Sequence, residues 1–322
     1  MKRLRAAVIG VGYLGNFHVQ KYLSLPEVDV VGAVETHPAR AAEISAKYGF
    51  PVHPTPDPLL NHIDLVSIVT PPRHHFAAAR DCLGHGIHVL VEKPVTETVL
   101  EAQALIDLAR RHGCVFQVGH LERFNPAVLA VRRRLRDPHR IESRRLSKYQ
   151  KRGTEVDVVL DLMIHDIDIV LSMIDSPVES MHATGSTVVS GDLDVAHATL
   201  HFANGCVADL TASRVNREPV RAMNIYQKDS YLSVDFLNHS LLVGRQGSDA
   251  GDAPPVEISF EEEALTRTDV LMDEIASFVA AVREGSAPTV TGEDGKRALE
   301  VAVAISSQIR DRQRRAQGAT AG

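Results

Sequence analysis

The chain has 322 residues, of which 44% are hydrophobic and 24% are charged, and its formal net charge is −6 at pH 7. This length suffices for two globular domains, and no apolar run approaches the roughly 20 residues of a membrane span. The net negative charge gives no general reason to expect a nucleic-acid partner. The three scattered cysteines, Cys82, Cys114 and Cys206, favour a reducing compartment over a disulfide framework or a zinc site.

The first 25 residues predict a turn that binds a dinucleotide. An apolar run, Leu4–Ile9, has the length of a strand and starts so near the first methionine that we expect no signal peptide and a cytoplasmic location. Gly10, Gly12 and Gly15 follow in G-x-G-x-x-G spacing and open a predicted helix, Tyr13–Leu25. The glycines allow a tight turn, close approach of the backbone to a pyrophosphate, and close packing of the helix on the strand. The helix N-terminus then faces the phosphates with its partial positive charge.

A second apolar run, Val28–Val34, ends at a carboxylate. Glu35 follows the last glycine by about 20 residues, which is the spacing of the dinucleotide fingerprint. At this position the side chain is placed to accept hydrogen bonds from a ribose diol. A 2′-phosphate would meet a like charge there, so the pattern predicts NAD rather than NADP as the cofactor.

Strand and helix continue to alternate to about residue 120, which predicts a doubly wound parallel sheet with right-handed crossovers. Further strands are expected at Leu65–Thr70, His88–Val91 and Val115–Val118. Further helices are expected at Arg40–Tyr48, Phe76–Gly84 and Leu100–His112. Ligands bind at the carboxyl ends of such strands. Polar motifs follow three of these ends, at Thr70-Pro71-Pro72, Glu92-Lys93-Pro94 and Gly119–Arg123.

The pattern changes after residue 122, and we therefore expect a first domain over 1–122 and a second over 123–322. In the second, successive hairpin signals, of which Asn204-Gly205 is the strongest, predict an antiparallel sheet. The expected strands are Ile141–Tyr149, Ala196–Phe202, Cys206–Ser213, Met223–Gln227, Tyr231–Asp235, Leu241–Gly244 and Val256–Phe260. The expected helices are Ala127–Leu135, Val156–Met173, Val270–Glu284 and Gly295–Arg315.

Two motifs are candidates for proton chemistry. Lys93 lies at the carboxyl end of a buried strand, and Pro94 restricts it to extended conformations that help to aim its side chain. Asp161 and His165 are four residues apart, so on a helix they share one face. Such a carboxylate fixes the tautomer of the imidazole and makes it a better base. The alternatives are a lysine that caps a strand end at the surface and an Asp–His salt bridge, while no clustered ligands support a metal.

Two further stretches are candidates for binding substrate. Gly119–Pro126 places His120, Arg123 and Asn125 around one aromatic ring at the domain boundary, which suits either a ligand contact or a hydrogen-bonded hinge. Residues 132–152 contain ten lysines or arginines, ending at Arg152. They suit either a solvated surface or the recognition of an anionic, diphosphate-bearing substrate.

Together, the glycine motif, Thr70–His75, Glu92-Lys93-Pro94 and the Asp161–His165 pair resemble the Gfo/Idh/MocA oxidoreductases over nearly the whole chain. The resemblance implies an N-terminal Rossmann domain, a C-terminal α/β domain with an open, mostly antiparallel sheet, and a homodimer or homotetramer built on that sheet. It implies NAD as the cofactor and Lys93, Asp161 and His165 as catalytic residues. The implied cofactor contacts are Gly10, Gly12, Tyr13, Leu14, Gly15, Glu35, Thr70, Pro71, His75, Glu92 and Lys93.

Within the family, Gly119–Pro126 and Asp161–Asp168 resemble the enzymes that oxidise the C3 hydroxyl of a UDP-N-acetyl sugar, UDP-N-acetylglucosamine in particular. Their 3-keto products pass to a partner aminotransferase for lipid A synthesis. This resemblance implies substrate contacts from His120, Arg123, Asn125, Arg152 and His165, and no metal. Two other functions stay open: a dehydrogenase of inositol or a free hexose, and a catalytically silent NAD-binding regulator.

Overall fold

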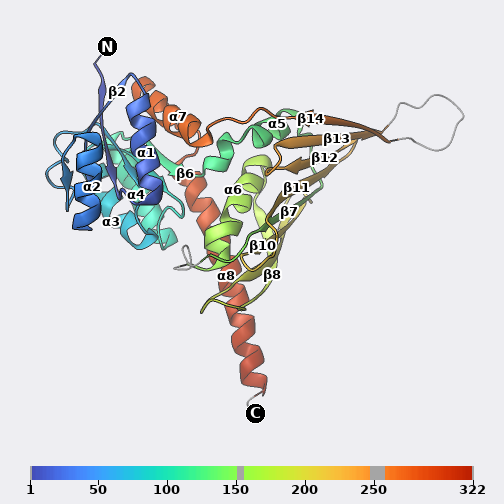
Figure 1. The fold of residues 1–322 in the computed structure, drawn as a ribbon. Coiled ribbons are helices and arrows are strands. Elements are labelled where there is room, and N and C mark those ends of the chain that lie inside the picture. The colour runs from blue at the N-terminus through green and yellow to red at the C-terminus, as the bar shows by residue number, and fades with distance from the viewer. Residues whose placement is uncertain (1, 151–155, 247–257, 321–322) are drawn as a thin grey trace, which may run out of the picture. The chain divides into compact units, whose positions relative to one another are not determined.

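The structure is a computed structural model that describes residues 2–150, 156–246 and 258–320 (Figure 1). The chain divides into two compact units. The first comprises Met1–Phe124 and Asp269–Leu299, and the second Asn125–Thr268 and Glu300–Gly322. The first unit thus includes a late segment that the sequence-based division at residue 122 does not foresee. As a division into domains, 1–122 and 123–322 stays a prediction.

The first unit is built on a six-stranded, fully parallel sheet. Its strands are β1 (Leu4–Ile9), β2 (Val28–Val34), β3 (Val52–His53), β4 (Leu65–Ile68), β5 (His88–Glu92) and β6 (Phe116–Gly119). Their order is β3-β2-β1-β4-β5-β6, so the direction of winding reverses between β1 and β4, where α/β sheets bind their ligands. The predicted doubly wound sheet is confirmed. The two-residue β3 is too short to produce a pattern in the sequence.

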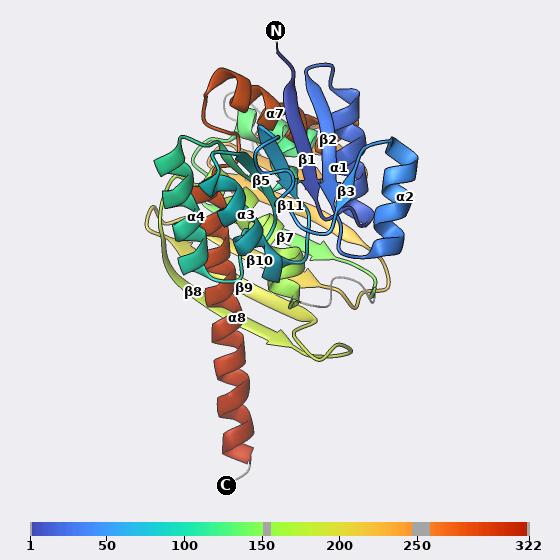
Figure 2. The ribbon, with the colours of Figure 1, turned by 90° about the vertical axis from the view of Figure 1, so that its left-hand side faces the viewer.

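Helices flank this sheet on both faces: α1 and α2 lie beside β1, β2 and β3, while α3 and α4 lie beside β5 (Figure 2). The α-helices that lie wholly in this unit are α1 (Tyr13–Ser24), α2 (Pro38–Tyr48), α3 (His75–Gly84), α4 (Val99–His112) and α7 (Val270–Glu284). Two short 3₁₀ helices, η1 (Pro72–His74) and η2 (Leu121–Phe124), follow strand ends. Local sequence sets the ends of α4, because Thr98 and Glu101 form a capping box and Gly113 ends the helix at φ +64°.

The core of the first unit joins residues from both of its segments. Val8 of β1 and Val19 and Tyr22 of α1 form one buried cluster with Ile275 and Phe278 of α7. All five side chains have no exposed surface. Helix α7 therefore completes the Rossmann core, although it follows the strands by about 150 residues.

The second unit is built on an eight-stranded sheet of order β14-β13-β12-β11-β7-β10-β9-β8. The strands are β7 (Arg140–Leu146), β8 (Val178–Ser186), β9 (Val195–Phe202), β10 (Val207–Ser213), β11 (Val220–Gln227), β12 (Ser230–Asp235), β13 (Ser240–Gln246) and β14 (Ile258–Ala264). All neighbours are antiparallel except β7 and β10, which are parallel, so the mostly antiparallel sheet is confirmed. The predicted hairpin joins β9 and β10, with Gly205 at φ +87°. Of the strand predicted at Val256–Phe260, residues 256 and 257 lie outside the described residues.

Helices cover one face of this sheet (Figure 1). Helix α5 (Pro126–Arg134) packs on β12 and β13, and α6 (Ile164–Met173) packs on β7 and β10. The buried Ala196 and Leu200 of β9 lie on the covered face of the sheet, while the alternating His197 and His201 are exposed on the other face. The long C-terminal helix, α8 (Gly292–Thr320), begins in the first unit and continues in the second. No helix among the described residues is both long enough and apolar enough to cross a bilayer.

Candidate active site

Two glycines of the turn between β1 and α1 cannot be replaced without moving the backbone. Gly10 has φ +86°, and a Cβ atom there would lie 2.6 Å from the carbonyl oxygen of Val69. A Cβ atom on Gly15 would overlap the carbonyl oxygen of Gly10, so α1 packs directly on the turn. Gly12 differs, because its missing Cβ would point into open space. The turn therefore leaves its outer side open at the point where the fingerprint places a pyrophosphate.

A cavity of about 520 Å³ lies beside this turn, at the reversal between β1 and β4. Five of the residues expected to contact the cofactor line it, namely Gly10, Gly12, Glu35, Thr70 and Pro71. The open side of Gly12, the start of α1 and a carboxylate after β2 are the features that an adenine dinucleotide requires. The residues present therefore fit NAD. Tyr13 and Leu14 open α1, and Tyr13 is 69% exposed.

The carboxylate of Glu35 is held at the rim of this cavity. Its Oε1 accepts a hydrogen bond of 2.9 Å from the backbone N–H of His37, which leaves Oε2 for a ligand. A 2′-phosphate of NADP bound beside this carboxylate would meet a like charge. The contact of Glu35 with the cofactor, and its part in a preference for NAD, stay predictions.

We expect Glu35→Ser to raise the affinity for NADP relative to NAD by about tenfold or more, because removal of one nearby like charge is worth at least ~1.4 kcal/mol. Fluorescence titration of the protein with each dinucleotide measures this ratio. Glu97→Ser is the matched control, since it removes an exposed carboxylate that does not line the cavity. An unchanged NADP affinity in Glu35→Ser would show that Glu35 does not discriminate between the two cofactors.

The Glu92-Lys93-Pro94 motif leaves the sheet at the carboxyl end of β5. Glu92 is buried and Lys93 is half-buried. The buried His75, at the start of α3, has Nδ1 2.8 Å from the carbonyl oxygen of Pro94 and Nε2 2.7 Å from that of Thr70. Burial lowers the pKa of His75, against the opposite effect of these two carbonyl oxygens. His75 therefore joins the loop after β4 to the loop after β5.

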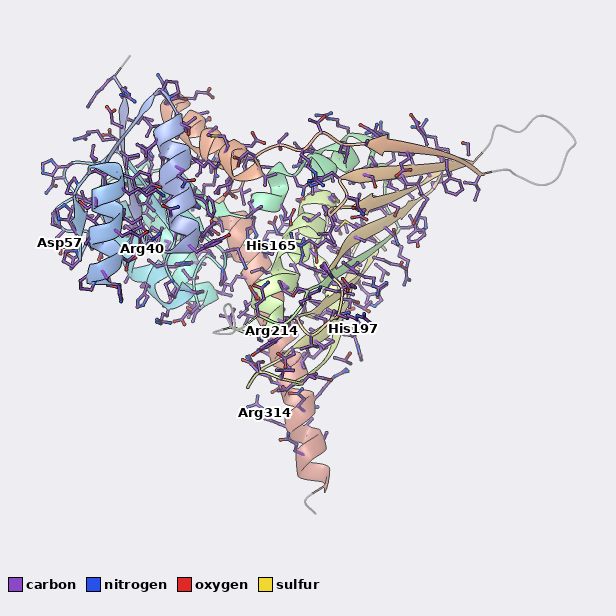
Figure 3. All side chains as sticks on the ribbon, viewed as in Figure 1. Arg40, Asp57, His165, His197, Arg214 and Arg314 are labelled. Carbon is purple, nitrogen blue, oxygen red and sulfur yellow. The ribbon has the colours of Figure 1, made fainter. Side chains whose placement is uncertain are left out.

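Asp161 and His165 lie in the second unit, on a helical segment that differs from the prediction. Instead of one α-helix over Val156–Met173, residues Val159–Met163 form a π-helical segment, η3, that leads into α6. Asp161 belongs to η3. His165, which is labelled in Figure 3, is the second residue of α6. Local π segments recur at functional sites. The pairing of Asp161 with His165, and their approach to Lys93 of the first unit, stay predictions.

The hinge stretch Gly119–Pro126 makes structural contacts of its own. Arg123 lies in η2 with its Nη2 3.6 Å from Oδ1 of Asp294, and its side chain is 6% exposed. Asn125 caps α5, because its Oδ1 accepts a hydrogen bond of 3.0 Å from the N–H of Ala127. His120 is buried. Both the hinge interpretation and the expected substrate contacts of His120, Arg123 and Asn125 stay predictions. Arg152 lies outside the described residues.

Several cations of the basic stretch are already neutralised. Arg145 donates to both carboxylate oxygens of Asp166 at 2.9–3.2 Å, and both side chains are under 5% exposed. Arg140 pairs with Asp209 at 2.6 Å across the sheet. The Arg145–Asp166 pair fixes the start of α6 beside His165 and was not predicted, because no local pattern connects residues 21 positions apart.

Comparisons with known proteins agree with this geometry. Residues 4–120 match the model of an oxidoreductase family with an NAD-binding Rossmann fold, and residues 127–231 match the Gfo/Idh/MocA C-terminal domain. The chain belongs to the Gfo/Idh/MocA oxidoreductase family. The predicted family, fold class and cofactor are thereby confirmed: this Gfo/Idh/MocA member is an oxidoreductase with an NAD-binding Rossmann domain.

Individual relatives cover almost the whole chain. It is 38% identical to the UDP-N-acetylglucosamine 3-dehydrogenase of Acidithiobacillus ferrooxidans over 95% of this chain and 97% of that protein. A solved structure of the same enzyme superposes with a TM-score of 0.90 at 37% identity, covering 96% of this chain and 98% of that one. The NAD⁺-dependent scyllo-inositol 2-dehydrogenase of Bacillus subtilis is 26% identical over 96% of this chain and 95% of that protein.

Proposed function

We propose that this oxidoreductase oxidises the C3 hydroxyl of a UDP-N-acetyl sugar, with UDP-N-acetylglucosamine as the first candidate, and passes hydride to NAD. The observation that carries the proposal is the 38% identity to a UDP-N-acetylglucosamine 3-dehydrogenase along 95% of the chain. The structural likeness to that enzyme, with a TM-score of 0.90, supports the same substrate class. A 3-keto sugar nucleotide would then be available to a partner aminotransferase.

In this proposal, three side chains act on one hydroxyl group. His165 accepts the hydroxyl proton, and Asp161 orients the imidazole. Lys93 donates a hydrogen bond to the same oxygen and stabilises the negative charge that develops there. Bound NAD supplies an acceptor for the hydride that leaves C3. Lys93 follows the carboxyl end of β5, and the glycine turn follows the carboxyl end of the parallel strand β1. Ligands bind at these ends of parallel strands, which supports the role of Lys93.

Oxidation of inositol is the second candidate. It is supported by the 26% identity to a scyllo-inositol 2-dehydrogenase over 96% of the chain. A catalytically silent regulator is less well supported, because the chain retains Lys93, Asp161 and His165 at the motif positions.

A substrate panel separates these functions. The purified protein is incubated with NAD and, in turn, UDP-N-acetylglucosamine, UDP-N-acetylgalactosamine, UDP-glucose, free N-acetylglucosamine, scyllo-inositol and glucose, and NADH formation is recorded. Because oxidation of an alcohol by NAD is unfavourable at neutral pH, each reaction includes hydrazine to trap the ketone. We expect NADH only with UDP-N-acetyl sugars. Equal rates with inositol would contradict the proposal, and NAD binding without turnover on any alcohol would favour the regulator.

We also propose that the protein self-associates through the face of the eight-stranded sheet that α5 and α6 leave uncovered. Register places Phe260 of β14 on this face, in line with Gly244 and Tyr231, and Phe260 is 60% exposed. An apolar ring so exposed on a polar sheet suits an interface. Light scattering is expected to give a dimer or tetramer that Phe260→Asp weakens, whereas a monomeric wild-type protein would contradict self-association.

A further inference from the structure

A cavity lined by arginines lies in the second unit, at the end of α5. It has a volume of about 400 Å³, which is in the range of small-molecule sites. We call it the arginine pocket. Its charged lining residues are Arg133, Arg134, Arg136, Asp229 and Arg245. Three of the four arginines come from the basic stretch over residues 132–152, and the fourth comes from β13.

Strand register explains why Arg245 reaches a cavity at the end of α5. Ser230 of β12 lies opposite Arg245 of β13, and Leu232 lies opposite Val243, so these four side chains share one face of the sheet. Leu232 and Val243 are buried, and α5 packs on β12 and β13. Arg245 therefore lies on the covered face, beyond the buried pair, where it lines the pocket together with the arginines at the end of α5.

Gln227, at the end of β11, fixes the backbone around the arginine pocket. It is buried, and its Oε1 accepts a hydrogen bond of 2.8 Å from the backbone N–H of Arg136. Its Nε2 donates to the carbonyl oxygen of Arg134 at 3.0 Å and to the hydroxyl group of Ser230 at 2.7 Å. One buried amide thus joins the end of α5 to the turn between β11 and β12. The walls that carry Arg134 and Arg136 are therefore in place before a ligand binds.

The four arginines differ in the contacts that they already make. Arg134 has its Nη2 2.6 Å from Oε2 of Glu263, so this pair is neutral. Nη1 of Arg136 donates to the carbonyl oxygen of the preceding residue at 2.9 Å and faces no carboxylate in that contact. In the part of the chain that the structure describes, the exposed side chains of Arg133 and Arg245 make no ion pair or hydrogen bond. These two guanidinium groups have no structural contact that a ligand would have to break.

The charge of the arginine pocket is opposite to that of the whole chain, which is −6. With the Arg134–Glu263 pair set aside, three guanidinium groups share the pocket with one carboxylate, that of Asp229. A concave positive region on a negative protein attracts small anions, and the planar guanidinium group matches the oxygens of a phosphate. No aromatic ring is among the described lining residues, so the pocket offers donors to phosphate oxygens and no surface on which a base could stack.

Within the second unit, the arginine pocket lies away from the start of α6. Arg145, which pairs with Asp166 next to His165, lies opposite Arg221 at the start of β11. Gln227, which frames the pocket, is at the other end of β11, roughly 20 Å along the strand. The pocket is therefore separate from the residues that hold His165 in the second unit.

We propose that the arginine pocket is a second ligand site, which binds the diphosphate group of a small molecule. Arg133, Arg136 and Arg245 donate hydrogen bonds to the phosphate oxygens. A diphosphate carries at least two negative charges, which balance the positive charges of these arginines that Asp229 leaves over. The diphosphate belongs either to inorganic pyrophosphate or to a nucleoside diphosphate. The proposal goes beyond the proposed oxidation and uses none of its residues.

Calorimetric titration with inorganic pyrophosphate tests the proposal. The full-length protein is first saturated with NADH, so that the glycine turn is occupied, and the ionic strength is about 0.15 M, at which weak surface attraction is screened. We expect wild type to bind pyrophosphate with a Kd below about 1 mM. The double variant Arg133→Ser/Arg245→Ser should bind at least about tenfold more weakly, because it lacks two charged donors. In a second titration, ADP that binds like pyrophosphate indicates recognition of the diphosphate alone, whereas tighter binding of ADP indicates a nucleoside diphosphate.

Arg132→Ser is the matched control. Arg132 is an exposed residue of the same helix that does not line the arginine pocket, so its loss should change the Kd less than about twofold. Thermal unfolding of each variant verifies that it folds. Equal binding by wild type and the double variant, an equal loss in Arg132→Ser, or no binding by wild type would each overturn the proposal. Because the titration needs no turnover, failure of the substrate panel leaves this test intact.

Discussion

Lys93→Met is expected to lower kcat about 100- to 1000-fold, which is the loss seen when one hydrogen-bond donor to a developing oxyanion is removed. The dissociation constant of NAD should change less than about twofold, because Lys93 lies after β5, outside the cavity beside the glycine turn. Stopped-flow measurement of NADH formation and fluorescence titration with NAD give the two quantities separately.

The matched control for this variant is Lys47→Met. Lys47 is an exposed residue of α2, and the same change of side chain there should leave both kcat and NAD affinity at wild-type values. Normal turnover in Lys93→Met would refute the role proposed for Lys93. A loss of NAD binding equal to the loss of turnover would assign Lys93 to the cofactor instead of the hydroxyl group.

Asp194→Ala is expected to destabilise the protein by about 3–5 kcal/mol, which is the cost of breaking a buried ion pair by removing one partner. Asp194 has no exposed surface and pairs with Arg214 (labelled in Figure 3), whose Nε lies 3.0 Å from Oδ1 of Asp194 and whose side chain is 4% exposed. The same carboxylate accepts hydrogen bonds from the N–H groups of Val188, Val189 and Ser190. The variant would remove the acceptor that all of these donors share.

Urea denaturation followed by circular dichroism measures this loss. The control is Asp311→Ala, which breaks the pair between Asp311 and Arg314 on α8, where the side chains are 55% and 75% exposed. Such surface pairs contribute about 0–1 kcal/mol. Similar losses in both variants would contradict the importance assigned to burial.

The carboxylate of Asp194 also predicts how the free energy of unfolding depends on pH. Burial alone would raise the pKa of Asp194, but the hydrogen bonds from the Ser190 hydroxyl and from three backbone N–H groups outweigh it, and hold the pKa well below the ordinary 3.8. Because the folded state binds this proton less readily than the unfolded state, the contribution is fully present above about pH 4 and is lost as pH falls below that value. The unfolding free energy of wild type should therefore fall more steeply below pH 4 than that of Asp194→Asn.

The sequence predicts the cofactor half of the molecule well, because its signals are local. The glycine spacing, the apolar runs of β1 and β2 and the carboxylate at Glu35 all lie within 35 residues and depend on short-range geometry. Glycines after α2 and α4 mark their ends in the same way, and both adopt positive φ. Asn204-Gly205 predicted its hairpin for the same reason.

The features that the sequence does not predict either depend on residues far apart in the chain or lack an alternation of apolar and polar residues. Strand β8 has a single buried side chain, Ala183, so no apolar alternation marks it. The parallel pairing of β7 with β10 joins segments more than 60 residues apart. The hydrogen-bonded His18 and Glu92 are separated by 74 positions, so no local pattern connects them. Spacing identified Asp161 and His165 as neighbours but did not show the π-helical segment between them.

The two-segment composition of the Rossmann unit has a consequence for biosynthesis. Its cluster around Val8 and Val19 is closed by Ile275 and Phe278, and these residues leave the ribosome only after the whole eight-stranded sheet has been made. The nascent N-terminal segment thus carries an uncovered apolar surface through most of translation, and chaperones bind such surfaces. A stop codon anywhere before α7 removes the residues that close this core, so the truncated product lacks a complete Rossmann unit.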